Sequence, residues 1–116
     1  MIDQLPAIYL GSASPRRQKL LRQIGVDFIA VEPSVVEEKL ADETPSEMVE
    51  RLAMVKAENV LQKINQQPPR PVLSADTIVV VDNIVLGKPK NEEDALYMLS
   101  LLSNRTHEVL TAVALI

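Results

Sequence analysis

Apolar residues follow two different spacings along the chain, and these spacings predict a succession of strands and helices. Short apolar runs bounded by turn-forming residues are typical of buried strands. Such runs occupy residues 8–10, 28–31, 72–81, 84–86 and 109–116. Apolar residues three and four positions apart predict helices over residues 15–24, 45–64 and 92–103. The pattern therefore predicts an α/β fold, with flanking helices packed on a mixed, twisted sheet.

Capping residues mark where the predicted helices begin. Ser14 is a good N-cap, and Pro15 suits the first helical position because its missing N–H would have no intrahelical partner there. The run Thr44-Pro45-Ser46-Glu47 is a capping box with proline at the first helical position. Asn91 can cap the third helix, and Gly25 provides a stop for the first. For the first helix, these signals place a strand-to-helix turn just before Ser14.

The first predicted helix has an unusual distribution of charge. Arg16 and Arg17 fall in its first turn, where the helix macrodipole favours carboxylates instead. This placement is stable when an anion lies at the helix start, because N–H groups, hydroxyls and guanidiniums converge on phosphate there. Ser12 and Ser14 supply hydroxyls in the same turn. A surface helix with two solvated arginines explains the local pattern equally well.

Two charged residues occupy positions that the pattern predicts to be apolar. Asp76 lies inside the run 72–81, where a carboxylate is destabilising unless it is paired, bound to metal or placed at a cleft. An edge-strand aspartate that faces solvent is the alternative. Lys56 lies in the middle of the apolar stripe of the second helix, so it must either extend to solvent or contact an anion.

Two predicted loops carry further charged candidates. The run Gly87-Lys88-Pro89 is typical of a stiff turn, which suits an ammonium directed at phosphate or simply an exposed lysine. The acidic stretch 32–43 is interpreted as a solvated loop. Either Glu37 or Glu38 within it can join Asp76 in binding Mg²⁺ or Mn²⁺, since hard cations prefer oxygen ligands.

Composition narrows the classes of function. The chain has 116 residues, a net charge of −4 and no cysteine. Net negative charge argues against a general nucleic-acid binder, although a local basic pocket can still hold a small anion. We recognise no secretory leader and no apolar run of membrane-spanning length, so we expect a cytoplasmic protein without membrane contacts. His107 is the single histidine and, without a nucleophile nearby, is interpreted as structural.

A series of short motifs extends over essentially the whole chain. They are Ser12-x-Ser14-Pro15-Arg16-Arg17, Glu37 in an acidic loop, Leu52-Ala53-x-x-Lys56-Ala57, Ala75-Asp76-Thr77-Ile78-Val79, Gly87-Lys88-Pro89 and Leu102-Ser103-x-x-Thr106-His107-x-Val109-x-Thr111-x-Val113. In this order they resemble the Maf family, the septum-formation-associated nucleotide pyrophosphatases. Gly11 departs from the family, in which alanine is common at this position, and glycine is conformationally compatible there. The resemblance implies a Maf/inosine-triphosphatase-like fold with a cleft between two lobes.

The resemblance also implies an activity and a set of site residues. The activity is hydrolysis of a nucleoside triphosphate to the monophosphate and pyrophosphate. Asp76 would activate the water, and Glu37 with Asp76 would bind the divalent cation. The residues implied to bind the substrate are Ser12, Ser14, Arg16, Arg17, Lys56, Thr77 and Lys88. The combination of Ser-Pro-Arg-Arg with Asp-Thr is similar to the branch acting on dTTP and UTP, which makes Arg16 and Thr77 candidates for base specificity.

The last residues are an apolar, strand-type run, 109–116, with no polar tail after it. Because Maf proteins continue beyond this point, we expect residues 1–116 to be the N-terminal portion of a single Maf-like domain. The exposed edge of such a strand leaves association into a homodimer open. A non-catalytic module that binds nucleotides or regulates cell division is the alternative function.

Overall fold

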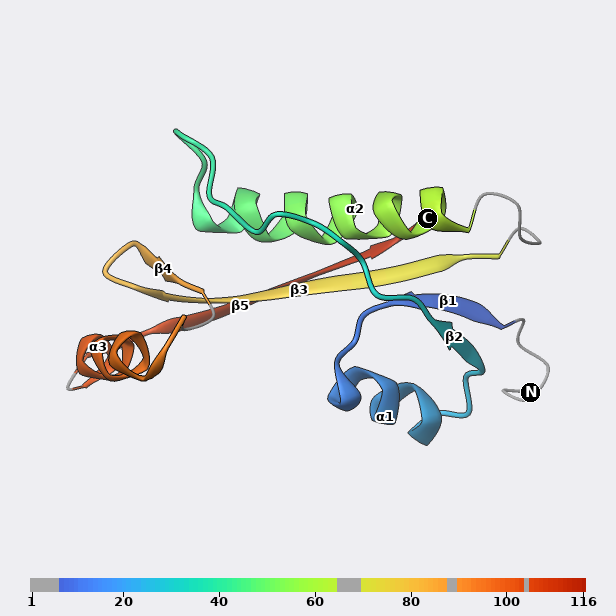
Figure 1. Ribbon diagram of the computed structural model, residues 1–116, viewed down its shortest axis with the longest axis horizontal. Coiled ribbons are helices and arrows are strands. Elements are labelled where there is room, and N and C mark those ends of the chain that lie inside the picture. Colours follow the sequence, from blue (N-terminus) through green and yellow to red (C-terminus); the bar gives the residue numbers. More distant parts are fainter. Residues whose placement is uncertain (1–6, 65–69, 88–89, 104) are drawn as a thin grey trace.

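A computed structural model describes residues 7–64, 70–87, 90–103 and 105–116 (Figure 1). Within these ranges the chain forms strands and helices in the predicted order. They are β1 (Ile8–Gly11), α1 (Pro15–Gln23), β2 (Phe28–Ala30), α2 (Pro45–Lys63), β3 (Val72–Val81), β4 (Ile84–Leu86), α3 (Glu92–Leu102) and β5 (Glu108–Leu115). The α/β fold class is confirmed, with the five strands in one mixed sheet.

The predicted caps form as the local sequence indicates. The Ser14 hydroxyl accepts a hydrogen bond from the Arg17 amide, and the Asn91 side chain accepts one from the Asp94 amide. At the start of α2 both halves of the capping box between Thr44 and Glu47 are present. These bonds satisfy amides that have no partner inside their helix, so each helix begins where its cap lies.

The sheet is organised around β3, the longest strand. β1 pairs in parallel with β2 on one side and with the first part of β3 on the other. β4 pairs antiparallel with the last part of β3. Because β5 pairs with β3 at both of these ends, β1 and β4 share the other edge of β3. The pairing with β1 ends at Gly11 and Ser74, and the pairing with β4 begins at Val79 and Leu86. Residues 75–78 therefore lie between two partner strands on that edge, while β5 pairs along the opposite edge.

α2 covers one face of this sheet and forms the core with it. Alternate side chains of β3 face the helix because successive strand residues point to opposite faces. Val72 packs in one buried cluster with Ala57 and Val60 of α2. Ile78 packs with Val49 in a second cluster further along the helix. Thus α2 is fixed along nearly the whole length of β3, which determines where its polar side chains lie.

The opposite face carries α1 and α3 at its two ends (Figure 1). The predicted apolar stripe of α1 is present, but Leu20 and Ile24 are 55% and 54% exposed, and neither helix has a buried residue. Val109 and Val113 of β5 are exposed as well. Helical spacing identifies which face is apolar, but it does not identify what covers that face.

Within the described ranges, none of the helices combines the length and apolar content of a membrane-spanning helix.

Gly11 is required by the close packing of β1 against β3 and α2. A Cβ at this position would lie 2.2 Å from Ser74 Oγ and 2.9 Å from a methyl group of Val60, both fully buried residues. Glycine is conformationally compatible with this position, and the structure adds that the space around it excludes a larger residue. The backbone conformation allows alanine, but the space does not.

We expect Gly11→Ala to destabilise the protein by about 1–3 kcal/mol, because overpacking displaces buried neighbours. Urea unfolding measures the loss. Gly87→Ala is the control, since a Cβ there meets nothing within 4 Å. The double variant Gly11→Ala/Ser74→Ala should recover part of the loss. Equal stability of Gly11→Ala and the unmodified chain would contradict the packing argument.

Candidate active site

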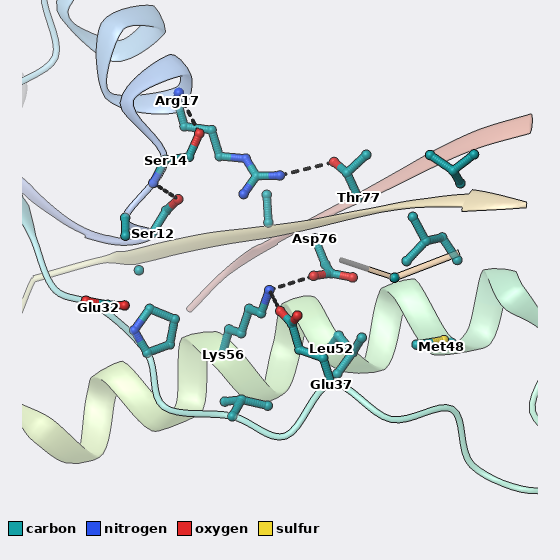
Figure 2. A pocket seen from close by; sticks show the side chains of 18 of the residues that line it. Ser12, Ser14, Arg17, Glu32, Glu37, Met48, Leu52, Lys56, Asp76 and Thr77 are labelled. Atoms are coloured by element: carbon teal, nitrogen blue, oxygen red, sulfur yellow. Dashed lines mark hydrogen bonds and ion pairs between the residues drawn. The ribbon is translucent and has the colours of Figure 1, made fainter. Parts of the chain in front are cut away.

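The stretch of β3 between β1 and β4 borders a cavity of about 670 Å³ (Figure 2). This volume is in the usual range for small-molecule sites. Its walls come from the β1–α1 turn, the segment before α2, α2 itself and the centre of β3. The sequence-predicted residues that line it are Ser12, Ser14, Arg17, Glu37, Lys56, Asp76 and Thr77. The fold thus brings together side chains that are up to 65 positions apart in the chain.

Two of the sequence-predicted residues are not among these. The Arg16 side chain is exposed on α1 and does not line the cavity. Its neighbour Arg17 does, because adjacent residues of a helix point about 100° apart. Lys88 lies outside the described residues. Glu38 does not line the cavity, which favours Glu37 of the two acidic alternatives.

Lys56 joins the two carboxylates on the α2 side of the sheet. Its Nζ atom lies 2.6 Å from Asp76 Oδ1 and 2.5 Å from Glu37 Oε1. The Lys56 and Asp76 side chains are only 13% and 7% exposed. Of the two outcomes left open for this lysine, extension to solvent or contact with an anion, the structure shows the second. The carboxylate of Asp76 is likewise paired rather than solvated.

The environment of Lys56 favours its charged form. Burial disfavours the ammonium, but the hydrogen bonds and charges of Asp76 and Glu37 outweigh this effect and raise the pKa of Lys56. A raised lysine pKa stabilises the fold at pH values below the ordinary value of 10.5, and this contribution is lost as the pH rises through the folded-state pKa. Lys56 is therefore cationic at neutral pH.

The second oxygen of Asp76 is the unusual atom of the site. Oδ2 is buried and has no hydrogen-bond partner among the described residues. A buried carboxylate oxygen without a partner points to a water or cation that completes the site. No three acidic or histidine side chains come together in the described part of the chain. Two carboxylates nevertheless fit Mg²⁺, which takes one or two protein carboxylates and fills its remaining positions with phosphate oxygens and water.

Thr77 faces the other side of β3 from Asp76 (Figure 2). Its Oγ1 accepts a hydrogen bond from Nη2 of Arg17 at 3.1 Å. It also lies 3.0 Å from Oγ1 of Thr111 on β5. The cavity is thus bordered by a carboxylate and lysine pair on one face of the sheet and by an arginine held by a neutral hydroxyl on the other.

The β1–α1 turn contributes hydroxyls and amides to the same cavity. The buried Ser12 hydroxyl accepts a hydrogen bond from the Ser14 amide at 3.0 Å, and Ser14 in turn caps α1. These bonds hold the turn so that the start of α1 faces the cavity (Figure 2). A helix N-terminus with hydroxyls and an arginine is suited to binding an anion.

The segment before α2 is held against the helix by side chains that the sequence analysis did not identify. Lys63 Nζ donates to the Glu32 carbonyl at 2.6 Å, and Asn59 accepts from the Ser34 amide at 2.9 Å. Arg51 Nη2 donates to the Glu38 carbonyl at 2.6 Å. These three helical side chains lie eight and four positions apart, so they share one stripe of α2. That spacing is the signal by which they could have been found.

The fold is shared with a protein of known structure. The fold is similar to that of a solved nucleoside-triphosphatase, described as a dITP/XTP pyrophosphatase, from Mycobacterium abscessus. The TM-score is 0.55 and the sequence identity 14%, with 95% of this chain and 73% of that chain covered. At this identity the likeness concerns the fold alone.

Sequence comparison then identifies the family. Residues 7–116 match the Maf family, described as Maf-like protein, and the chain belongs to it. It is 50% identical to a dTTP/UTP pyrophosphatase of Symbiobacterium thermophilum over 109 residues, which cover 94% of this chain and 55% of that protein. A second dTTP/UTP pyrophosphatase, from Alkalilimnicola ehrlichii, is 47% identical, with 96% and 56% covered. The chain thus spans about half the length of these relatives.

The Lys56–Asp76 pair yields a stability prediction. Lys56→Met leaves a buried carboxylate without its cation, so we expect a loss of about 3 kcal/mol. The double variant Lys56→Met/Asp76→Asn should be clearly more stable than Lys56→Met, because the unpaired charge is gone. Denaturant unfolding at pH 7 measures both, with the exposed Lys19→Met as the control. A double variant no more stable than Lys56→Met would show that the pair is not coupled.

The start of α2 yields a pH prediction. Hydrogen bonds from Arg51 and from the Leu40 amide hold the pKa of Glu43 below its ordinary value of 4.5. Its stabilising contribution is therefore present above pH 4.5 and is lost as the pH falls through the lowered pKa. We expect Glu43→Gln to make the curve of stability against pH flatter in that acidic range. Glu50→Gln, at an exposed position of α2, is the matched substitution for comparison. Parallel acid curves for Glu43→Gln and the unmodified chain would refute this.

Proposed function

We propose that this chain carries the catalytic face of a nucleoside triphosphate pyrophosphatase that acts on dTTP and UTP. The observation that carries the proposal is the buried Lys56–Asp76 pair beside the cavity, with Oδ2 of Asp76 left without a partner. A buried carboxylate held on one oxygen and open on the other is suited to accept a proton from water. The names of the curated relatives support the nucleotide class.

In the proposed reaction the oxygen of a water molecule bonds to the α-phosphorus, while a proton of that water passes to Asp76. The bridging P–O bond between the α- and β-phosphates breaks, and pyrophosphate leaves with that bond's electron pair. Lys56 holds Oδ1 of Asp76, so the other oxygen keeps its place at the cavity. Lys56 thus orients Asp76, and Asp76 accepts the proton. Charged groups that are already in place before the reaction lower its barrier, because they need not reorganise during it.

The phosphate chain would be bound from the other side of the cavity. Arg17, the hydroxyls of Ser12 and Ser14 and the start of α1 supply donors for its oxygens. We propose that Glu37 and Asp76 hold Mg²⁺ or Mn²⁺, which when bound neutralises phosphate charge. Thr77 inside the cavity and Arg16 at its exterior remain the candidates for base selection, and Lys88 a candidate for phosphate binding. Because nucleoside triphosphates are metabolites of the cytoplasm, a cytoplasmic location accords with this substrate.

Pyrophosphate release tests the proposal. With Mg²⁺ or Mn²⁺ we expect release from dTTP and UTP, about tenfold or more above that from CTP, ATP and 7-methyl-GTP. Asp76→Asn should lower the rate by about 100-fold or more, since that is the usual effect of losing a general base. Asp27→Asn, an exposed carboxylate outside the cavity, should leave the rate unchanged.

Two results would contradict the proposal. Full activity of Asp76→Asn would show that Asp76 is not the base. Nucleotide binding without release by the unmodified chain would favour the alternative function, a binding module that performs no catalysis. The same panel run on a full-length relative would then show whether the activity needs residues that this chain lacks.

A further inference from the structure

Thr111 belongs to β5 and is not among the residues that line the cavity. In the antiparallel pairing of β3 with β5 it stands directly opposite Thr77. The two Oγ1 atoms are 3.0 Å apart, which is hydrogen-bonding distance. Thr77 does line the cavity, so Thr111 contacts a site residue from the far strand.

The hydroxyl of Thr77 has one proton to donate and can accept two hydrogen bonds. Arg17 Nη2 uses one of the acceptor positions, at 3.1 Å. The bond with Thr111 then uses either the proton or the second acceptor position. In both cases Thr77 Oγ1 is held from two directions, one from α1 and one from β5.

Such a second bond affects the direction of the Thr77 side chain. A threonine hydroxyl can occupy three staggered positions, and the Thr77 side chain is exposed, so packing alone does not select one. The bond with Thr111 favours the position in which Oγ1 also meets Arg17. Thr111 therefore acts on Arg17 through Thr77.

The chemical character of this link is as important as its geometry. Within the part of the chain that the structure describes, Arg17 forms no ion pair. Its guanidinium is oriented by a neutral hydroxyl, so its direction is fixed while its charge remains available to an anion. A carboxylate in place of Thr77 would orient the guanidinium too, but it would compete with phosphate.

We propose that Thr111 is a positioning residue that sets the Arg17 guanidinium toward the phosphate chain of a nucleotide. The phosphate part of this inference rests on the proposed function. The orientation of Arg17 does not, and it can be measured in the free protein.

The test compares three variants of the chain. Thr111→Val keeps the branched shape and removes the hydroxyl, whereas Thr111→Ser keeps the hydroxyl. Val113→Thr is the matched control, because Val113 is exposed on the same face of the same strand and lies outside the site. Unfolding curves establish that all three fold.

Two readouts separate positioning from a structural role. The first is the NMR order parameter of the Arg17 Nε–H group in the free protein, which should fall in Thr111→Val and stay high in Thr111→Ser and Val113→Thr. The second is the affinity for dTTP and for inorganic tripolyphosphate, measured by calorimetry with Mg²⁺. Loss of one oriented hydrogen bond predicts about five- to tenfold weaker binding in Thr111→Val, restored by serine.

Each outcome decides one of the two claims. An Arg17 order parameter unchanged in Thr111→Val would overturn the inference, and so would a freed Arg17 with unchanged affinity for both probes. If the unmodified chain binds neither dTTP nor tripolyphosphate, the proposed function and the phosphate part of the inference fail. In that case, an Arg17 order parameter that falls in Thr111→Val but not in Thr111→Ser or Val113→Thr would still establish that Thr111 orients Arg17.

Discussion

The ion pairs that join Lys56 to Asp76 and Glu37 are the interaction on which the arrangement of the site depends. A carboxylate on the covered face of a sheet is stable only if a cation reaches it, and α2 provides that cation from the middle of its apolar face. The packing of α2 along β3 determines how far along the strand the ammonium lies. The polar stripe of α2 then holds the segment that carries Glu37 against the same ammonium. The position of the segment before α2 and the meeting of both carboxylates at Lys56 therefore follow from the packing of α2 along β3.

The divergence of β1 from β3 makes the two faces of the strand accessible to one ligand. Because β1 leaves β3 after Gly11 and β4 joins only at Val79, residues 75–78 border the cavity with side chains on both faces. Asp76 presents a paired negative group to one side, and Thr77 directs Arg17 on the other. The guanidinium of Arg17 is thus on the other face of the sheet from the Asp76 carboxylate, which is paired with Lys56. In the proposed function, this separation would let the phosphate chain meet Arg17 and a divalent cation meet the carboxylates, without Arg17 and the carboxylates neutralising each other.

The features that depend on local sequence could be predicted, and those that depend on register could not. Ser14, the Thr44 capping box and Asn91 act within one turn, so the helix starts followed from the sequence. The pattern also indicated that Lys56 and Asp76 each needed a partner. It left open whether the partner of Lys56 was phosphate or the carboxylate of Asp76, because that depends on how α2 packs on β3. Thr111 belongs to one of the sequence motifs, but the sequence assigned it no role, because its position opposite Thr77 arises only when β5 pairs with β3. The exposure of the α1 and α3 apolar faces likewise depends on what packs there, which a helical period does not specify.

The most direct test of this account is to locate a bound metal–nucleotide complex in the cavity. Mn²⁺ added with dTTP broadens the NMR signals of nearby nuclei, so the broadening maps its position. The account predicts the strongest broadening at Asp76 and Glu37, with Ser12 and Arg17 affected next, and Asp76→Asn should weaken the whole pattern. Broadening centred elsewhere, for example on the acidic first turn of α3 at Glu92 and Glu93, would contradict the claim that the Lys56–Asp76 pair organises the binding site.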